Sequence, residues 1–258
     1  MIKLSRDIGI DLGTANVLVY LDGKGIVVNE PSAVALDKNT GKVLEVGAAA
    51  KKMLGRTPGN IVAARPLERG AISDYDMTAT MLSVYLRRIT KMSLVKPRVV
   101  VSVPSGITEV EERAVIQAAM EAGARRVYLM EEPLAAAIGA GMNIKGAGGS
   151  MVIDIGGGTT DIAVLSLNNV VRSTSIDAAG DAFDSAIIQY IRERYQVLVG
   201  NQTAEEIKMA IGCVNPRPEA LVMTVKGRNL SSGLPQEVDV TSVDVMHALT
   251  TPCRDILY

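Results

Sequence analysis

One short pattern occurs twice in this 258-residue chain, and it constrains the fold more than any other feature. Residues 11–14 read Asp-Leu-Gly-Thr and residues 154–160 read Asp-Ile-Gly-Gly-Gly-Thr-Thr, and each lies between two apolar runs. An apolar run, a glycine-containing turn and a second apolar run predict a strand, a tight turn and a returning strand. Because the copies lie about half a chain apart, we interpret them as the openings of two related halves, not as units of a solenoid.

The residues of both turns are suited to binding phosphate. Glycine lets the backbone approach a ligand and direct its N–H groups at an anion, and threonine hydroxyls add further donors. The carboxylates of Asp11 and Asp154 would repel phosphate unless a hydrated Mg²⁺ lies between them and the phosphate oxygens. One glycine hairpin alone would more often be purely structural, but two copies that each begin with aspartate favour a nucleotide held between the two halves.

Three other kinds of phosphate site do not fit the sequence. A Walker A loop needs Gly-Lys-Ser/Thr at the start of a helix, and the sequence contains no such string. A Rossmann fingerprint leads from a strand into a helix, whereas residues 156–158 lead into an apolar run typical of a strand. Protein-kinase signatures are also absent from the sequence.

The composition indicates a folded globular chain. Hydrophobic residues make up 48% and charged residues 21% of the sequence. The formal net charge of −1 argues against a general polyanion binder, so nucleic acid is not expected as a partner. Cys213 and Cys253 are too few for a disulfide framework or a zinc site. With no signal peptide or membrane-spanning run visible, we expect a reduced, cytoplasmic protein.

The middle of the chain predicts an α/β fold with a parallel sheet. Residues 99–103 read as a buried strand, and Thr108 begins a helix that Gly123 ends. Residues 127–130 read as the next strand, which makes a β-α-β crossover. Pro133 suits the first turn of a further helix. Other helices are expected at 76–91, 184–194, 203–212 and from 242, and other strands at 25–28, 32–36, 221–225 and 237–240.

The glycine-rich segment 146–150 is the clearest break in the sequence, so we place the boundary between the halves near residue 145. The predicted halves are 1–145, with a small insertion near 32–65, and 146–258, with a small subdomain near 182–241.

The paired hairpins resemble the phosphate motifs of the superfamily of actin, heat-shock chaperones and sugar kinases. Within it, residues 9–16, 131–139 and 154–160 resemble the MreB family of bacterial actin homologues. The similarity extends over essentially the whole chain, including Arg65-Pro66 and residues 104–108. It implies an actin-like ATPase fold, in which two related α/β halves of ribonuclease-H-like type surround a nucleotide cleft.

The resemblance assigns catalytic and metal-binding roles to four residues. Asp11 and Asp154 would hold the water shell of Mg²⁺. Glu132 corresponds to the catalytic acid that orients the attacking water, and Thr159 would help to place that water. A carboxylate between a strand end and a helix start is chemically suited to this role, although an ordinary helix cap is the alternative for Glu132.

The same resemblance assigns the residues that bind ATP. The phosphates would be bound from one side by Gly13, Thr14, Ala15 and Asn16, and from the other side by Gly156, Gly157, Gly158, Thr159 and Thr160. Gly180 and Asp181 would close over the nucleotide, and Glu205, Glu206, Ile207 and Lys208 would lie at the ribose and adenine. Without the family resemblance, Glu205 and Lys208 would more often be interpreted as a solvated ion pair, on a helix that Thr203 and Glu206 are expected to cap. Asp161 stands where relatives commonly have Glu, and we expect little consequence.

The family pattern continues with a glycine-rich turn that holds the other face of the adenine, and the sequence reaches Tyr258 before it. We therefore expect the C-terminal part of the fold to be missing, as in a fragment or a truncated reading frame. A truncated copy that no longer binds nucleotide firmly is the alternative.

The resemblance implies an ATP- and Mg²⁺-dependent protein that polymerises into membrane-associated filaments and organises cell-wall synthesis and rod shape. Its partners would be other copies of itself and the cell-wall synthesis machinery, at the inner face of the cell membrane. Slow ATP hydrolysis would time filament turnover. Met92, Leu94 and Val95 form a short apolar loop that would touch the membrane, or else pack on its own domain. A metabolic kinase of the same superfamily is the alternative function, whereas a chaperone would need a peptide-binding domain.

Overall fold

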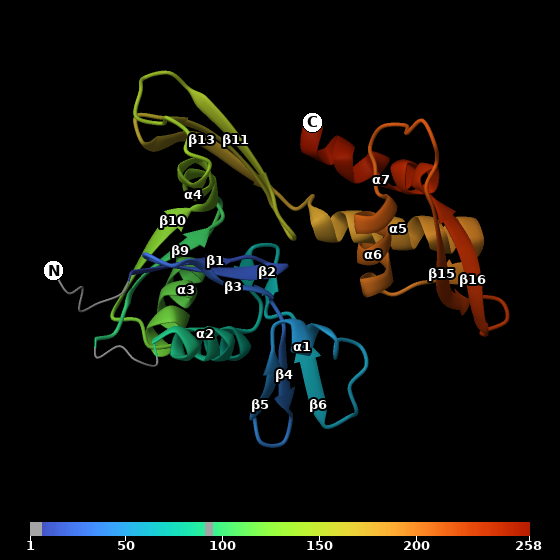
Figure 1. Cartoon of the computed structure of the whole chain (residues 1–258), viewed down its shortest axis with the longest axis horizontal. Coiled ribbons are helices and arrows are strands. Elements are labelled where there is room, and N and C mark those ends of the chain that lie inside the picture. Colours follow the sequence, from blue (N-terminus) through green and yellow to red (C-terminus); the bar gives the residue numbers. More distant parts are fainter. Residues whose placement is uncertain (1–6, 91–94) are drawn as a thin grey trace. The chain divides into compact units, whose positions relative to one another are not determined.

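The structure is a computed structural model that describes residues 7–90 and 95–258. The residues up to Ser175 and those from Ile176 onward form two compact units, which are described separately. Figure 1 labels their helices and strands.

A five-stranded sheet forms the centre of the first unit, with the strand order β10-β9-β1-β2-β3. Strand β1 pairs antiparallel with β2 and parallel with β9, which in turn pairs parallel with β10. The predicted hairpin at residue 11 and the predicted parallel crossover are therefore both confirmed. The strands are β1 (Asp7–Leu12), β2 (Asn16–Leu21), β3 (Gly25–Pro31), β9 (Arg98–Val103) and β10 (Arg126–Glu131).

Two helices, α2 (Tyr75–Thr90) and α3 (Glu109–Glu121), pack with this sheet into the largest hydrophobic core of the molecule. The alternation of the strand directs Ile8, Ile10 and Leu12 of β1 into that core, where each is at most 4% exposed. Helix α3 begins with a capping box in which the Thr108 hydroxyl accepts from the N–H of Glu111 and the Glu111 carboxylate accepts from the N–H of Thr108. The predicted start of this helix is thus confirmed.

Small elements fill the segment between β3 and α2. Strands β4 (Val34–Asp37), β5 (Val43–Val46) and β6 (Ile61–Ala64) form a sheet in the order β5-β4-β6 beside the short helix α1 (Ala48–Lys51), blue to cyan in Figure 1. Strands β7 (Leu67–Glu68) and β8 (Ala71–Ile72) form a separate hairpin whose turn is Arg69-Gly70.

A second sheet completes the first unit, with the order β11-β12-β13. Its strands are β11 (Ser150–Ile155), β12 (Thr160–Ser166) and β13 (Asn169–Ile176). Helix α4 (Glu132–Gly139) packs against β11 and β12, and Ala137 of the helix is buried with Ala163 and Leu165 of β12. Residues 150–155 and 160–166 thus form the second predicted hairpin.

The second unit contains the remaining elements. They are α5 (Gly180–Tyr195), β14 (Val197–Leu198), α6 (Asn201–Ile211), β15 (Val222–Asn229), β16 (Pro235–Thr241) and α7 (Ser242–Leu257). The three strands form a sheet in the order β14-β15-β16, and Ile187, Ile207 and Val240 belong to the core between the sheet and the helices. The Asp244 carboxylate closes a capping box with Thr241 and also accepts from the hydroxyls of Tyr190 and Tyr195.

One local prediction in this unit is wrong. Thr203 and Glu206 do not cap α6, because the helix begins two residues earlier, at Asn201, with Gly200 as its N-cap residue. The Glu206 carboxylate instead accepts from the side-chain amide of Gln202.

The compact units divide after Ser175, whereas the predicted halves divide near residue 145. The reason is that α4, which precedes residue 145, packs against β11 and β12, which follow it. Compactness does not test a division based on duplication, so the halves 1–145 and 146–258 stay a prediction. Among the helices of the described part of the chain, none is both long and apolar enough to cross a membrane.

Candidate functional site

The turns of the two aspartate hairpins touch each other within the first unit. A Cβ atom added to Gly157 would lie 2.6 Å from the Cβ of Ala15 and 3.0 Å from its backbone nitrogen. A Cβ atom on Gly158 would lie 2.7 Å from the Oγ1 of Thr14. Real Cβ atoms do not approach other atoms this closely, so only glycine allows the contact. The structure therefore brings the two predicted phosphate turns together.

A third turn, Arg69-Gly70 between β7 and β8, lies against both hairpins. The N–H of Gly70 donates to the Oγ1 of Thr14 over 2.8 Å, and a Cβ on Gly158 would lie 2.8 Å from the Cα of Arg69. Both residues of the turn have a positive φ, 50° for Arg69 and 73° for Gly70. This turn was not predicted to belong to the site, and the adjacent residues Arg69 and Gly70, of which glycine is typical of a turn, were the one available signal.

The backbone of each hairpin turn is held firmly in place. In the first, the Ser32 hydroxyl donates to the carbonyl oxygen of Gly13 over 2.5 Å. In the second, the N–H of Gly156 donates to the carbonyl oxygen of Thr159 over 2.9 Å. The side chains of Thr14 and Thr159 are both buried. Residues expected to donate to phosphate are thus preorganised by contacts with protein groups.

Four carboxyl groups, each from a different strand or helix, lie at the candidate site. Asp11 is the last but one residue of β1, and its carboxylate accepts from the Ser102 hydroxyl of β9 over 2.8 Å. Asp154 of β11 lies opposite Asp161 of β12 in the strand ladder. Asp161 is 1% exposed and accepts from the N–H of Ser105 over 3.1 Å. Glu132 is the first residue of α4.

The electrostatics show that these carboxyl groups share one neighbourhood. Burial raises the pKa of Glu132 to about 8, and the charges of Asp11, Asp161 and Asp154 add to the rise. Burial also raises the pKa of Asp154, with Asp11 and Asp161 as further causes. The pKa of Asp11 rises through burial, and the hydrogen bond from Ser102 offsets part of that rise. Negative charge gathered in this way is unfavourable by itself, which makes the cluster suited to a divalent cation.

The residues are suited to a Mg²⁺ ion that is held through its water shell. In the ranges 7–90 and 95–258, no three His, Cys, Asp or Glu side chains stand close enough to hold a metal ion themselves. Mg²⁺ keeps several of its waters and is commonly bound by one or two carboxylates together with substrate phosphates. Asp11 and Asp154 lie beside turns rich in N–H donors and are suited to that arrangement, and the role expected for them at Mg²⁺ stays a prediction.

Glu132 is not the cap of its helix. The N-cap residue of α4 is Glu131, and within this fully described helix no side chain makes a capping hydrogen bond. Pro133 follows Glu132 in the first turn, as predicted. The carboxyl group of Glu132 therefore belongs to the acidic cluster, and the catalytic role expected for it stays a prediction.

The residues expected at the ribose and adenine lie in the second unit, where several of them gather at Asp184. The Nζ of Lys208 is 2.8 Å from the Oδ1 of Asp184 and donates to the carbonyl oxygen of Gly180 over 2.9 Å. Burial raises the pKa of Asp184, Lys208 opposes this rise, and the charges of Glu205 and Asp181 add to it. Asp184 was not anticipated, because the spacing on one helix cannot show which residue of another helix lies beside it.

The other two residues of this predicted group, Ile207 and Glu206, have different surroundings. Ile207 is fully buried in the core of the second unit, so its side chain has a packing role. Glu206 is exposed on the surface of α6. Of the loop predicted to touch a membrane, Met92 and Leu94 lie outside the described residues, and Val95 is partly exposed.

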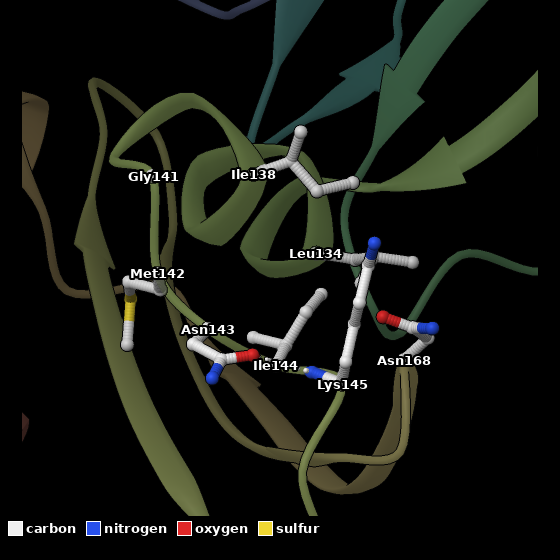
Figure 2. A pocket seen from close by; sticks show the side chains of 8 residues that line it. All are labelled: Leu134, Ile138, Gly141, Met142, Asn143, Ile144, Lys145 and Asn168. Carbon is white, nitrogen blue, oxygen red and sulfur yellow. Dashed lines mark hydrogen bonds between the residues drawn. The ribbon is translucent and has the colours of Figure 1, made fainter.

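A separate hollow of about 390 Å³ lies at the C-terminal part of α4 (Figure 2). Leu134 and Ile138 of the helix line it together with Ile144 and the side chains of Lys145 and Asn168. None of the four clustered carboxyl groups lines this hollow. It is therefore distinct from the candidate phosphate site, although the same helix carries Glu132 at its other end.

Comparison with known proteins gives a consistent picture. The MreB/Mbl protein family model matches residues 5–258. The cell shape-determining protein Mbl of Bacillus subtilis is 52% identical over 246 residues, which cover 95% of this chain and 74% of Mbl. The cell shape-determining protein MreB of Escherichia coli is 49% identical over 259 residues, which cover 98% of this chain and 75% of MreB.

Solved structures agree with the sequence relatives. MreB5 of Spiroplasma citri bound to AMPPNP has a TM-score of 0.92 at 40% identity, over 98% of this chain and 76% of MreB5. A second crystal structure of MreB5 is bound to ADP. The MamK double helical filament, at 21% identity and a TM-score of 0.78, is similar in fold alone. The predicted actin-like α/β fold is confirmed, and the chain spans about three quarters of the length of these relatives.

Proposed function

Because the chain belongs to the MreB/Mbl family, we propose that it is an actin-like, cell shape-determining protein that binds ATP with Mg²⁺ and assembles into filaments. The observation that carries this proposal is the contact of the two glycine turns beside four clustered carboxyl groups. That S. citri MreB5 binds AMPPNP and ADP supports a nucleotide as the ligand. A metabolic kinase, the alternative considered from the sequence, is not favoured by these relatives.

The roles that we propose for the individual residues are those that the family resemblance implies. N–H groups and hydroxyls of residues 13–16 and 156–160 bind the β- and γ-phosphates from two sides. Asp11 and Asp154 would hold the water shell of Mg²⁺, which would neutralise part of the phosphate charge. Glu132 orients the attacking water and accepts its proton, and Thr159 helps to position that water. In the second unit, Gly180, Asp181, Glu205 and Lys208 contact the nucleoside.

Sedimentation tests the assembly part of this proposal. The protein is centrifuged at high speed with Mg²⁺ and ATP, with ADP, or without nucleotide, and pelleted protein is measured. A filament-forming protein pellets with Mg²⁺ and ATP, whereas a kinase that acts on a small substrate stays in the supernatant. Supernatant protein in every condition, at concentrations where ATP binding is saturated, would contradict the proposal.

Release of inorganic phosphate tests the proposed role of Glu132. Glu132→Ala is expected to abolish phosphate release while ATP-dependent pelleting remains, because the lost carboxylate acts on water and not on assembly. Glu131→Ala is the matched control, since it removes the neighbouring carboxyl group, which does not contribute to the raised pKa of Glu132. Unchanged release by Glu132→Ala would remove this residue from catalysis.

We further propose that the filaments act at the inner face of the bacterial membrane and organise the cell-wall synthesis machinery. The support is the cell shape-determining role of the relatives and the apolar side chains of Met92, Leu94 and Val95 in the sequence. Each copy would bury little apolar area, so binding depends on many copies in one filament. Flotation with lipid vesicles tests this: Met92→Ser with Leu94→Ser should abolish flotation of filaments, and Leu234→Ser should leave it unchanged.

A further inference from the structure

The hydroxyl group of Ser105, in the loop between β9 and α3, is buried and has no hydrogen-bond partner among the described residues. A buried hydroxyl of this kind is unfavourable, because it has exchanged its hydrogen bonds with water for none in the protein. Such groups are rare in native structures, and each of them needs an explanation. The position of Ser105 at the candidate site provides one.

The backbone of Ser105 places this hydroxyl beside the carboxyl cluster. The N–H of Ser105 donates to the Oδ1 of Asp161 over 3.1 Å, and only two carbon atoms separate that nitrogen from the hydroxyl oxygen. Although it lies next to this carboxylate, the hydroxyl does not donate to it. Asp161 is 1% exposed and is one of the charges that raise the pKa of Glu132. The Ser105 hydroxyl therefore shares the neighbourhood of Glu132.

The residue before Ser105 borders the second hairpin turn. A Cβ atom added to Gly70 would lie 2.5 Å from the Cγ of Pro104 and 3.5 Å from the Oγ1 of Thr159. Pro104 and the Thr159 hydroxyl thus approach the same point at the turn of β7 and β8. Ser105 follows Pro104 and contacts Asp161, which lies two residues after Thr159. The loop after β9 therefore runs along the hairpin that carries Thr159.

The same segment is held on both sides by contacts that do not involve the Ser105 hydroxyl. The Ser102 hydroxyl donates to Asp11 of the first hairpin, and the Ser105 N–H donates to Asp161 of the second. These two bonds fix the backbone around Ser105 and leave its hydroxyl available. A donor or acceptor fixed in this way needs no reorganisation when a reacting group arrives.

Packing alone does not account for a hydroxyl group at this position. An apolar side chain of similar size would fill the same space without burying an unsatisfied polar atom. A hydroxyl can both donate and accept a hydrogen bond. It is therefore suited to hold a water molecule whose other hydrogen bond goes to a carboxylate.

We propose that the Ser105 hydroxyl is a further catalytic group of this site, which binds the attacking water together with Glu132 and Thr159. This inference rests on the proposed ATP-dependent function. The water oxygen forms a bond to the γ-phosphorus, the bond between that phosphorus and the β,γ-bridging oxygen breaks, and ADP and inorganic phosphate result. Glu132 accepts the proton that the water loses. The Ser105 oxygen accepts a hydrogen bond from the other hydrogen of the water, and Ser105 keeps its own proton.

Release of phosphate from ATP and Mg²⁺ in a single turnover is the first measurement. Ser105→Ala should slow release about tenfold, the loss expected for one hydrogen bond to the reacting water. Ser105→Thr and Ser105→Val form a matched pair of similar shape, of which only the threonine keeps a hydroxyl. The threonine variant should retain most of the rate, and the valine variant should be as slow as the alanine variant. Calorimetry should give the same ADP affinity for all of them, because the hydroxyl contacts water and not ADP.

Stability without nucleotide is the second measurement, and it separates catalysis from a structural role. Ser105→Ala should leave the free energy of unfolding unchanged or raise it. The variant removes a buried hydroxyl that no described protein group satisfies, and it keeps the N–H that holds Asp161. Urea denaturation of the wild-type protein and the variant gives the comparison.

Three results would overturn the proposal. They are unchanged phosphate release by Ser105→Ala, slower release accompanied by a loss of stability, and equal rates for the threonine and valine variants. In each of them the wild-type protein still hydrolyses ATP, so the proposed function stands. Wild-type protein that binds ATP and releases no phosphate would contradict the proposed hydrolysis itself, and the role of Ser105 with it.

Discussion

The two aspartate hairpins have the same local sequence pattern but different structural surroundings. The first is fixed on several sides: Ser102 holds the Asp11 carboxylate, Ser32 holds the carbonyl of Gly13, and Gly70 holds the hydroxyl of Thr14. The second is built from three consecutive glycines and follows a strand in which Met151, Ile153 and Ile155 are more than half exposed. A phosphate motif is therefore a local property, whereas the contribution of its strand to stability depends on what packs against it.

The largest effect expected from this difference is on stability, and it concerns Ile10 and Ile153, which precede the aspartates of the two hairpins. Ile10→Ala should lower the free energy of unfolding of the first unit by about 2–5 kcal/mol, since it leaves a cavity in the core. Ile153→Ala should change it by no more than about 0.5 kcal/mol, because the side chain is 52% exposed. Urea denaturation of both variants measures this contrast. Equal losses would show that β11 is as well covered as β1.

The next effect concerns the contact between the hairpins. In Gly157→Ala the new methyl group would collide with Ala15, which is expected to cost about 1–3 kcal/mol and to move the two turns apart. Affinity for ADP with Mg²⁺ should fall about tenfold or more, which corresponds to about 1.4 kcal/mol.

Gly148→Ala is the control for this prediction, because a Cβ there meets nothing within 4 Å. Calorimetric titration of both variants with ADP and Mg²⁺ measures their affinities. If Gly157→Ala bound as tightly as Gly148→Ala, the contact between the turns would not form the ligand site.

A pH effect should follow from the acidic cluster. The pKa of Glu132 lies at about 8 in the folded protein, and at its ordinary value of 4.5 when the chain is unfolded. Between these values the unfolded state binds fewer protons, so stability without Mg²⁺ or nucleotide should fall as pH rises from about 5 to 8. Glu132→Gln should flatten this part of the profile. Thermal unfolding across the pH range tests the claim, and a wild-type profile as flat as that of the variant would contradict it.

The smallest effect concerns the hydrogen bond that the Ser102 hydroxyl donates to Asp11. Ser102→Ala removes a hydrogen bond to the carboxylate, which should raise the pKa of Asp11 further and weaken Mg²⁺-dependent ADP binding by about 0.5–1.5 kcal/mol. ADP affinity at several Mg²⁺ concentrations measures the loss. Ser105 is a useful comparison, because it holds Asp161 through its backbone N–H, so Ser105→Ala should retain that bond.

Much of the fold could be predicted because its signals are local. Apolar runs around a glycine turn located both hairpins, and the Thr108–Glu111 pair located the start of α3. The start of α6 was misjudged because Thr203 and Glu206 have the residue types of a capping box without forming one. Residue types at the right spacing are necessary for a cap, but the backbone around them decides where the helix begins.

The parts of the site that could not be predicted depend on contacts between distant segments. The turn at Arg69-Gly70 carries no phosphate motif, yet it touches both hairpins. Asp184 becomes the partner of Lys208 only when α5 and α6 pack together. The exposure of β11 is likewise invisible in its sequence, because apolar residues occupy positions 151, 153 and 155 just as they occupy positions 8, 10 and 12 of the buried strand β1.

Hydrogen exchange with and without ADP and Mg²⁺ tests the central claim most directly, namely that both hairpins belong to one nucleotide site. The account predicts that the ligand slows the exchange of residues 13–16 and residues 156–160 together, with the same dependence on ligand concentration. Protection of one turn without the other, or of neither at saturating ligand, would contradict it.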